Sequence, residues 1–77
     1  MNTNQTLAVL KAFYFGCESM EKISRKTNLS REEVREALRG ARECGLIKYS
    51  TRDYHETFVH VESKKLGAYL KTKGIIR

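Results

Sequence analysis

The sequence predicts a small, mostly helical α+β domain, and three features lead to this expectation. A pair of helices joined by a tight turn is predicted within residues 19–44. Two segments of alternating apolar and polar residues within 46–61 predict a β-hairpin. The length of 77 residues suits one domain with a small core. We therefore expect a single domain, 1–77, with helices at about 4–16, 19–27, 30–44 and 63–73.

The first helix is predicted from a nearly continuous apolar run. Residues 6–15 read TLAVLKAFYF, with one lysine as the only interruption. Leu7, Leu10 and Tyr14 follow helical spacing, whereas Val9 points elsewhere. A helix that is apolar around most of its perimeter needs cover on more than one side. In so small a domain, we expect a second copy of the chain to supply part of that cover.

Two capping signals mark the ends of the longer central helix. Ser30 followed by Glu33 has the pattern of a capping box, which sets the start of the helix. Gly45 suits the left-handed backbone position that follows a helix end. One buried stripe is expected from the i, i+3, i+4, i+7 spacing of Val34, Ala37, Leu38 and Ala41. With the shorter helix before it, this segment predicts a helix–turn–helix.

Four arginines lie along one flank of the central helix, beside the buried stripe: Arg31, Arg35, Arg39 and Arg42. A row of guanidinium groups suits phosphates and guanine edges, to which arginine can donate two hydrogen bonds. The same helix carries Glu32, Glu36 and Glu43 at spacings that allow ion pairs within the helix. An ordinary salt-bridged, solvated surface is therefore the alternative interpretation of this helix.

Composition narrows the class of partner. There are 15 Lys and Arg residues against 9 Asp and Glu, a net charge of +6, which favours a polyanion such as nucleic acid or an acidic membrane surface. No apolar run is long enough to span a bilayer and the first residues do not form a signal pattern, so we expect a cytoplasmic protein without a membrane partner. Cys17 and Cys44 are expected to be free, half-buried thiols, although a disulfide between them stays open.

The predicted order of elements is helix, helix, helix, strand, loop, strand, helix. In this order, and in residues 23–30, Val34, Leu38 and the segment ECGLI at 43–47, the chain resembles winged helix–turn–helix DNA-binding domains. Such domains occur in bacterial, archaeal or viral transcriptional regulators, including those of the multiple-antibiotic-resistance and arsenic-repressor types. The resemblance covers about residues 7–61. It implies a three-helix core, a two-stranded β-hairpin wing and a C-terminal helix.

The resemblance implies a small, dimeric transcriptional regulator that binds double-stranded DNA in a sequence-specific manner. Residues 30–40 would be the recognition helix in the major groove. The expected DNA contacts are Arg25, Lys26, Ser30, Arg31, Arg35, Arg39, Arg42, Arg52 and Tyr54. The first and last helices are expected to form the homodimer through Leu7, Leu10, Tyr14, Leu66, Tyr69 and Leu70.

Two other functions stay open. A protein-interaction module, such as an adaptor or inhibitor of another regulator, would use Glu32, Glu33 and Glu36 as partner contacts. A DNA-bending accessory protein for recombination or replication is the third candidate. Catalysis is not expected, because His55 and His60 have no evident catalytic partners and the chain has no glycine-rich phosphate loop. No metal, cofactor or small-molecule ligand is predicted.

Overall fold

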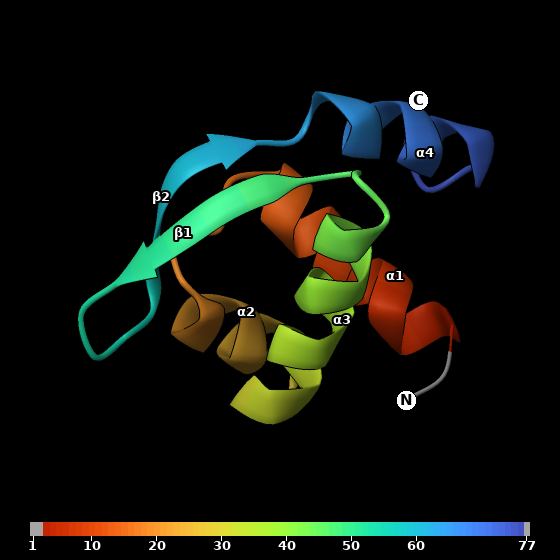
Figure 1. The fold of residues 1–77 in the computed structure, drawn as a ribbon. Helices are drawn as coiled ribbons and strands as arrows, with labels where there is room; N and C mark the ends of the chain where they lie inside the picture. Colours follow the sequence, from red (N-terminus) through yellow and green to blue (C-terminus); the bar gives the residue numbers. More distant parts are fainter. Residues whose placement is uncertain (1–2, 77) are drawn as a thin grey trace.

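The computed structural model describes residues 3–76, which form four helices and one two-stranded antiparallel sheet (Figure 1). The elements are α1 (Thr3–Tyr14), α2 (Met20–Thr27), α3 (Arg31–Glu43), β1 (Lys48–Arg52), β2 (Thr57–Glu62) and α4 (Lys64–Thr72). A small, mostly helical α+β domain is therefore confirmed. No helix within residues 3–76 combines the length and the apolar character needed to cross a bilayer.

Both ends of α3 are fixed by the caps that the sequence predicts. The Ser30 hydroxyl accepts from the Glu33 N–H at 3.1 Å, and the Glu33 carboxylate accepts from the Ser30 N–H at 3.1 Å. At the other end Gly45 has a φ of 78°, and the Leu46 N–H donates to the Ala41 carbonyl at 3.0 Å. This is the Schellman arrangement, and it turns the chain out of α3 towards β1.

The first helix ends two residues earlier than expected, and the same kind of cap explains the difference. Gly16 has a φ of 91°, and the Cys17 N–H donates to the Ala12 carbonyl at 3.2 Å. Gly16 therefore lies beyond the helix, and α1 ends at Tyr14. Cys17 is half-buried and Cys44 is exposed; both are free thiols, so no disulfide joins them.

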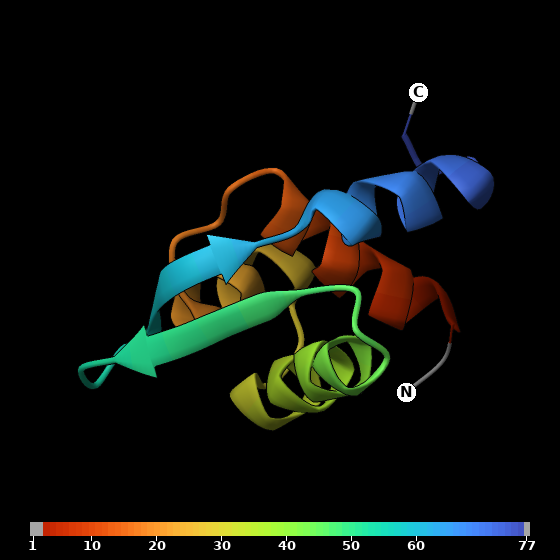
Figure 2. The ribbon, with the colours of Figure 1, turned by 45° about the horizontal axis from the view of Figure 1, so that its top comes forward.

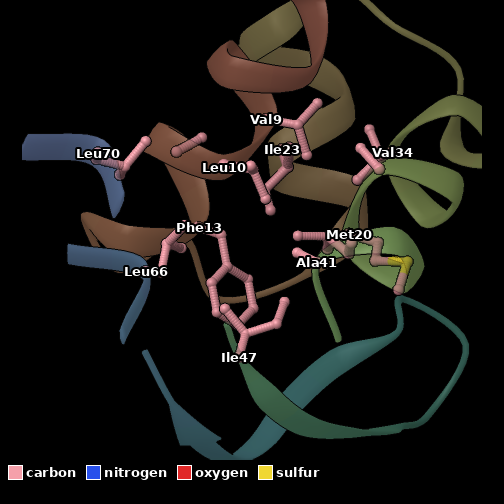
Figure 3. Close-up of a cluster of buried hydrophobic side chains, with 13 residues drawn as sticks. Val9, Leu10, Phe13, Met20, Ile23, Val34, Ala41, Ile47, Leu66 and Leu70 are labelled. Atoms are coloured by element: carbon pink, nitrogen blue, oxygen red, sulfur yellow. The ribbon is translucent and has the colours of Figure 1, made fainter. Parts of the chain in front are cut away.

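The core lies where α1, α2 and α3 meet, and α4 closes it from the side of α1 (Figure 3). Its most deeply buried side chains are Val9, Ile23, Val34, Leu38, Ile47, Leu66 and Leu70. All three other helices pack on α1. Most of the apolar perimeter of α1 is thus covered within one chain, and Val9, which departs from the expected stripe, is completely buried.

This packing corrects half of the predicted dimer interface. Leu10, Leu66 and Leu70 are 3%, 0% and 0% exposed, so they have no surface to offer a second copy. Their apolar character is needed to join α4 to α1. The other predicted interface residues, Leu7, Tyr14 and Tyr69, are half-buried against the same core.

The β-hairpin contains an irregularity that its sequence does not reveal. Ser50 pairs with Val59, but the next pair is Lys48 with Glu62, so β2 has one extra residue in between. His60 lies in this bulge with a φ of 55°. The bulge ends the expected alternation and leaves Val61 50% exposed.

The hairpin is tied to the helices by the loop between α1 and α2. The Phe58 N–H donates to the Glu18 carbonyl at 2.8 Å, and Ser19 forms a short antiparallel bridge with Thr57. The ring of Phe58 packs edge-on to Phe13 of α1, with the ring centroids 5.0 Å apart. The hairpin loop projects at the opposite end of the molecule from α4 (Figures 1 and 2).

Candidate nucleic-acid interface

A side chain in the first turn of α3 contacts the hairpin loop, residues 53–56. Arg31 Nη1 donates to the Tyr54 carbonyl at 3.1 Å. The same guanidinium lies 5.4 Å from the centre of the Tyr54 ring, close enough for a cation–π contact. Asp53 shapes the loop, because its carboxylate accepts from the His55 N–H at 3.0 Å. Two of the predicted DNA-contacting residues, Arg31 and Tyr54, therefore lie together on one surface.

Glu56, at the end of the loop, binds a second arginine of α3. Arg35 Nη2 and Nε donate to the two carboxylate oxygens of Glu56 at 2.8 and 3.3 Å. This bidentate pair raises the pKa of Arg35 above its ordinary value, with the hydrogen bond to Glu56 as the main cause. Arg31 also lies 3.8 Å from Glu56. One carboxylate thus serves two arginines that are one helical turn apart.

Glu21 makes the corresponding link between α2 and the hairpin loop. Its carboxylate accepts from Arg25 at 2.9 Å, lies 3.4 Å from Arg31 and contacts the ring nitrogen Nδ1 of His55. The pKa of Glu21 is lowered from its ordinary 4.5, chiefly by the hydrogen bond with His55. Glu21 and Glu56 are each more than three-quarters buried at the side chain, and together they hold α2, α3 and the loop in one charged network.

The remaining arginines of α3 also have partners within the chain. Arg39 pairs with Glu36, the only one of the ion pairs considered within this helix that forms among the described residues. Arg42 lies 5.0 Å from the centre of the Tyr49 ring. The side chains of Arg35 and Arg39 nevertheless stay 48% and 51% exposed. Three of the four arginines, Arg31, Arg35 and Arg39, are therefore salt-bridged and still partly open to solvent.

The other predicted contact residues are not all gathered here. Arg25 and Arg52 are 78% and 69% exposed at the side chain. Arg52 borders a separate hollow together with Cys17. Lys26 is exposed near the end of α2, and the Ser30 hydroxyl is engaged in the capping box. The structure therefore joins Arg25, Arg31, Arg35 and Tyr54 in one network and leaves Lys26 and Arg52 outside it.

A groove lies on the opposite flank of α3, between that helix, α1 and α4. Its volume is about 750 Å³. Small residues of α3 form part of its lining, and two acidic residues stand on the same helix at its border. The lining comprises Thr6, Leu10, Glu33, Glu36, Ala37, Gly40, Ala41, Cys44, Leu46 and Tyr69. The sequence did not predict this groove, because it depends on where α4 packs.

Residues 3–76 contain no group of three His, Cys, Asp or Glu side chains placed to hold a metal ion. Within the same part of the chain, every buried side-chain nitrogen or oxygen has a hydrogen-bond partner. Comparisons of the whole chain with protein-family models, curated proteins and solved structures found no match.

Proposed function

We propose that the protein is a winged helix–turn–helix domain that binds double-stranded DNA in a sequence-specific manner, as a small transcriptional regulator. The order of elements supports this fold, with α2, a tight turn and α3 followed by a hairpin. The bridge between Ser19 and Thr57 adds a short third strand position beside the hairpin. The contact of Arg31 with Tyr54 carries the proposal, because it places the loop of the wing beside the start of α3.

In this proposal α3 enters the major groove, with the residues of its N-terminal half closest to the bases. Arg35 is the strongest candidate for reading a base. Glu56 uses two of its N–H groups, and an arginine has five, so three stay available for guanine or a phosphate. Because Glu56 fixes the plane of the guanidinium, less conformational freedom is lost when DNA binds.

The acidic residues of α3 are compatible with a role in selectivity. Glu32 and Glu36 lie on its exposed surface, where a carboxylate can accept from the amino group of cytosine and repels phosphates. α3 contains four arginines and four glutamates, so it adds no net charge. In such a helix, contacts with base edges would specify the sequence and contacts with phosphates would only position the protein.

Selection from a random-sequence duplex library, followed by titration of the selected site, tests the proposal. Replacing Arg35 or Arg39 with Ala should weaken binding to that site by about 1–3 kcal/mol and relax the preference at one position. Lys11→Ala is the control, because Lys11 is exposed on α1 and outside the network. If both arginine variants bind the selected site as tightly as the Lys11 variant, α3 does not read DNA.

The mass of the protein should be measured in parallel, free and on DNA. A homodimer would place two copies of α3 about one helical turn of DNA apart, on a near-palindromic site. Leu7, Tyr14 and Tyr69 are the predicted interface residues that keep some exposed surface. A monomer on a single half-site would remove the dimer from the proposal and leave the DNA contacts of α3 in place.

A protein-interaction module is the second candidate, and the groove beside α3 favours it. Ala37, Gly40 and Ala41 in its lining are small, so a partner helix could pack close to the backbone of α3. Glu33 and Glu36 would pair with basic residues on that helix. Salt dependence separates the two functions. Contacts with phosphates weaken steeply as salt rises, whereas the apolar contacts of a partner helix with Ala37, Gly40 and Ala41 would not.

A further inference from the structure

The net positive charge of the protein is concentrated on α4 and the residue that follows it, and not on α3. Residues 64–73 contain four lysines and no acidic residue, which gives +4 of the total +6. α3 is neutral, with four arginines and four glutamates. The hairpin, 48–62, has two basic and three acidic residues, which gives −1. The charge that favours a polyanionic partner therefore lies mostly outside the surface assigned to α3 and the loop.

The packing of α4 turns three of these lysines towards solvent. Leu66, Gly67 and Leu70 are buried on the side of α1. Lys64, Lys65 and Lys71 are exposed, and none of them forms an ion pair with the part of the chain that the structure describes. We call these three residues the α4 lysine strip. The other fully exposed side chains of α4, Ala68 and Thr72, are small, and Tyr69 is half-buried.

The placement of two of these lysines is unfavourable for the helix itself. Lys64 and Lys65 occupy the first turn of α4, where the helix dipole favours negative charge, and that turn contains no acidic residue. Ser63, at the N-cap, makes no side-chain hydrogen bond that would offset this arrangement. A pattern that opposes local stability is typical of a surface with a binding role.

We propose that the α4 lysine strip binds the backbone phosphates of duplex DNA, as a surface separate from α3 and the hairpin loop. Lysine binds phosphate as a point charge and carries no base preference. Lys64 and Lys71 are seven residues apart, or about 10 Å along the helix, a length of duplex that carries about six phosphate charges. A membrane surface fits less well, because the strip has no large apolar side chain to insert between lipids.

The choice of DNA as the polyanion rests on the proposed function, but the location of the surface does not. α4 and the hairpin loop lie at opposite ends of the molecule (Figures 1 and 2). The strip therefore meets a different stretch of duplex from the one that contacts the loop. It supplies affinity that is independent of sequence, which the neutral α3 lacks.

Titration of a random-sequence duplex at several salt concentrations tests the strip. The variant is Lys64→Gln with Lys71→Gln, which removes two exposed charges and keeps good helix formers. The plot of log affinity against log salt should lose about 1.8 units of slope, or about 0.9 for each phosphate contact. Between about 50 and 200 mM salt, the variant should then lose about twelvefold less affinity than the wild-type protein.

The matched control is Lys11→Gln with Lys22→Gln, which removes the same charge from α1 and α2. It should keep the wild-type slope, since these residues lie outside the strip. An equal slope for the α4 variant and this control overturns the inference, as does tighter binding of the wild-type protein to phosphatidylserine vesicles than to duplex DNA. Far-UV circular dichroism verifies that both variants are folded.

The two proposals fail in different ways. If α3 does not read DNA, Arg35→Ala leaves the binding of a selected site unchanged, while the α4 variant still loses salt dependence. If the strip does not bind phosphates, Arg35→Ala still weakens the selected site, and the α4 variant keeps its slope on random duplex. A protein that binds no duplex at low salt overturns both.

Discussion

The pair formed by Arg35 and Glu56 offers the sharpest test of how the hairpin is held against α3. The two side chains are 48% and 21% exposed and share two hydrogen bonds, at 2.8 and 3.3 Å. Exposed ion pairs contribute about 0.2–1 kcal/mol, and loss of one partner from a buried pair costs about 3–5 kcal/mol. For a bidentate, half-exposed pair we expect a coupling free energy of about 1 kcal/mol.

A double-mutant cycle measures this coupling. Arg35→Met keeps the apolar stem and the helix propensity, and Glu56→Gln keeps the size of the side chain. Urea denaturation of the wild-type protein, both single variants and the double variant gives the four free energies of unfolding. In about 1 M salt the Debye length falls to about 3 Å, so the coupling should shrink.

The chain supplies a matched control in Arg39 and Glu36, which are 51% and 62% exposed and lie on the same helix. For this pair we expect a coupling of about 0.3 kcal/mol, typical of exposed residues three or four apart on a helix. If the Arg35–Glu56 coupling were no larger than that of the control, the bidentate pair would not hold the hairpin to α3.

Three further outcomes follow from the packing and the caps. Because the pKa of Glu21 is lowered in the folded protein, its stabilising effect is present above about pH 4.5 and is lost as the pH falls through the lower pKa of the folded state. In the Glu21→Gln variant, the urea concentration at the midpoint of unfolding should therefore decrease less in acid than it does in the wild-type protein. Ser30→Ala should lower the free energy of unfolding by about 1 kcal/mol, since it removes the capping hydroxyl from α3, and thermal denaturation would detect a shift of about 4–8 °C. A Cβ on Gly67 would lie 2.7 Å from the Tyr14 ring. Replacing this helical glycine with Ala should therefore raise the free energy of unfolding by about 0.5–1 kcal/mol only when Tyr14 is also replaced by Leu. An equal gain with Tyr14 present would contradict the close packing.

The order of elements was predictable because its signals are local. The capping box at Ser30 and the glycine after α3 each act within a few residues, and the structure contains both. The element that packs on α1 was not predictable, because an apolar helix surface does not identify the segment that will bury it. The burial of Leu66 shows that α4 of the same chain supplies part of that cover.

The charged network escaped prediction for the same reason. Arg35 and Glu56 are 21 residues apart in the sequence, and Glu21 and His55 are 34 apart. The spacing along α3 predicts an ion pair of Arg35 with the nearby Glu32, and it contains no information about the distant Glu56. The bulge at His60 also has no local signature, because a residue other than glycine seldom adopts positive φ.

The separation of the lysines of α4 from the balanced charges of α3 has a kinetic consequence if both surfaces bind DNA as proposed. Long-range attraction to the duplex would arise mainly at α4, which has no acidic residue to offset its field. The rate of association would then depend on α4 and on ionic strength, whereas the residence time on a matched site would depend on α3. The rate at which the protein finds DNA and the time that it stays on one site would therefore change independently, through substitutions in α4 and in α3.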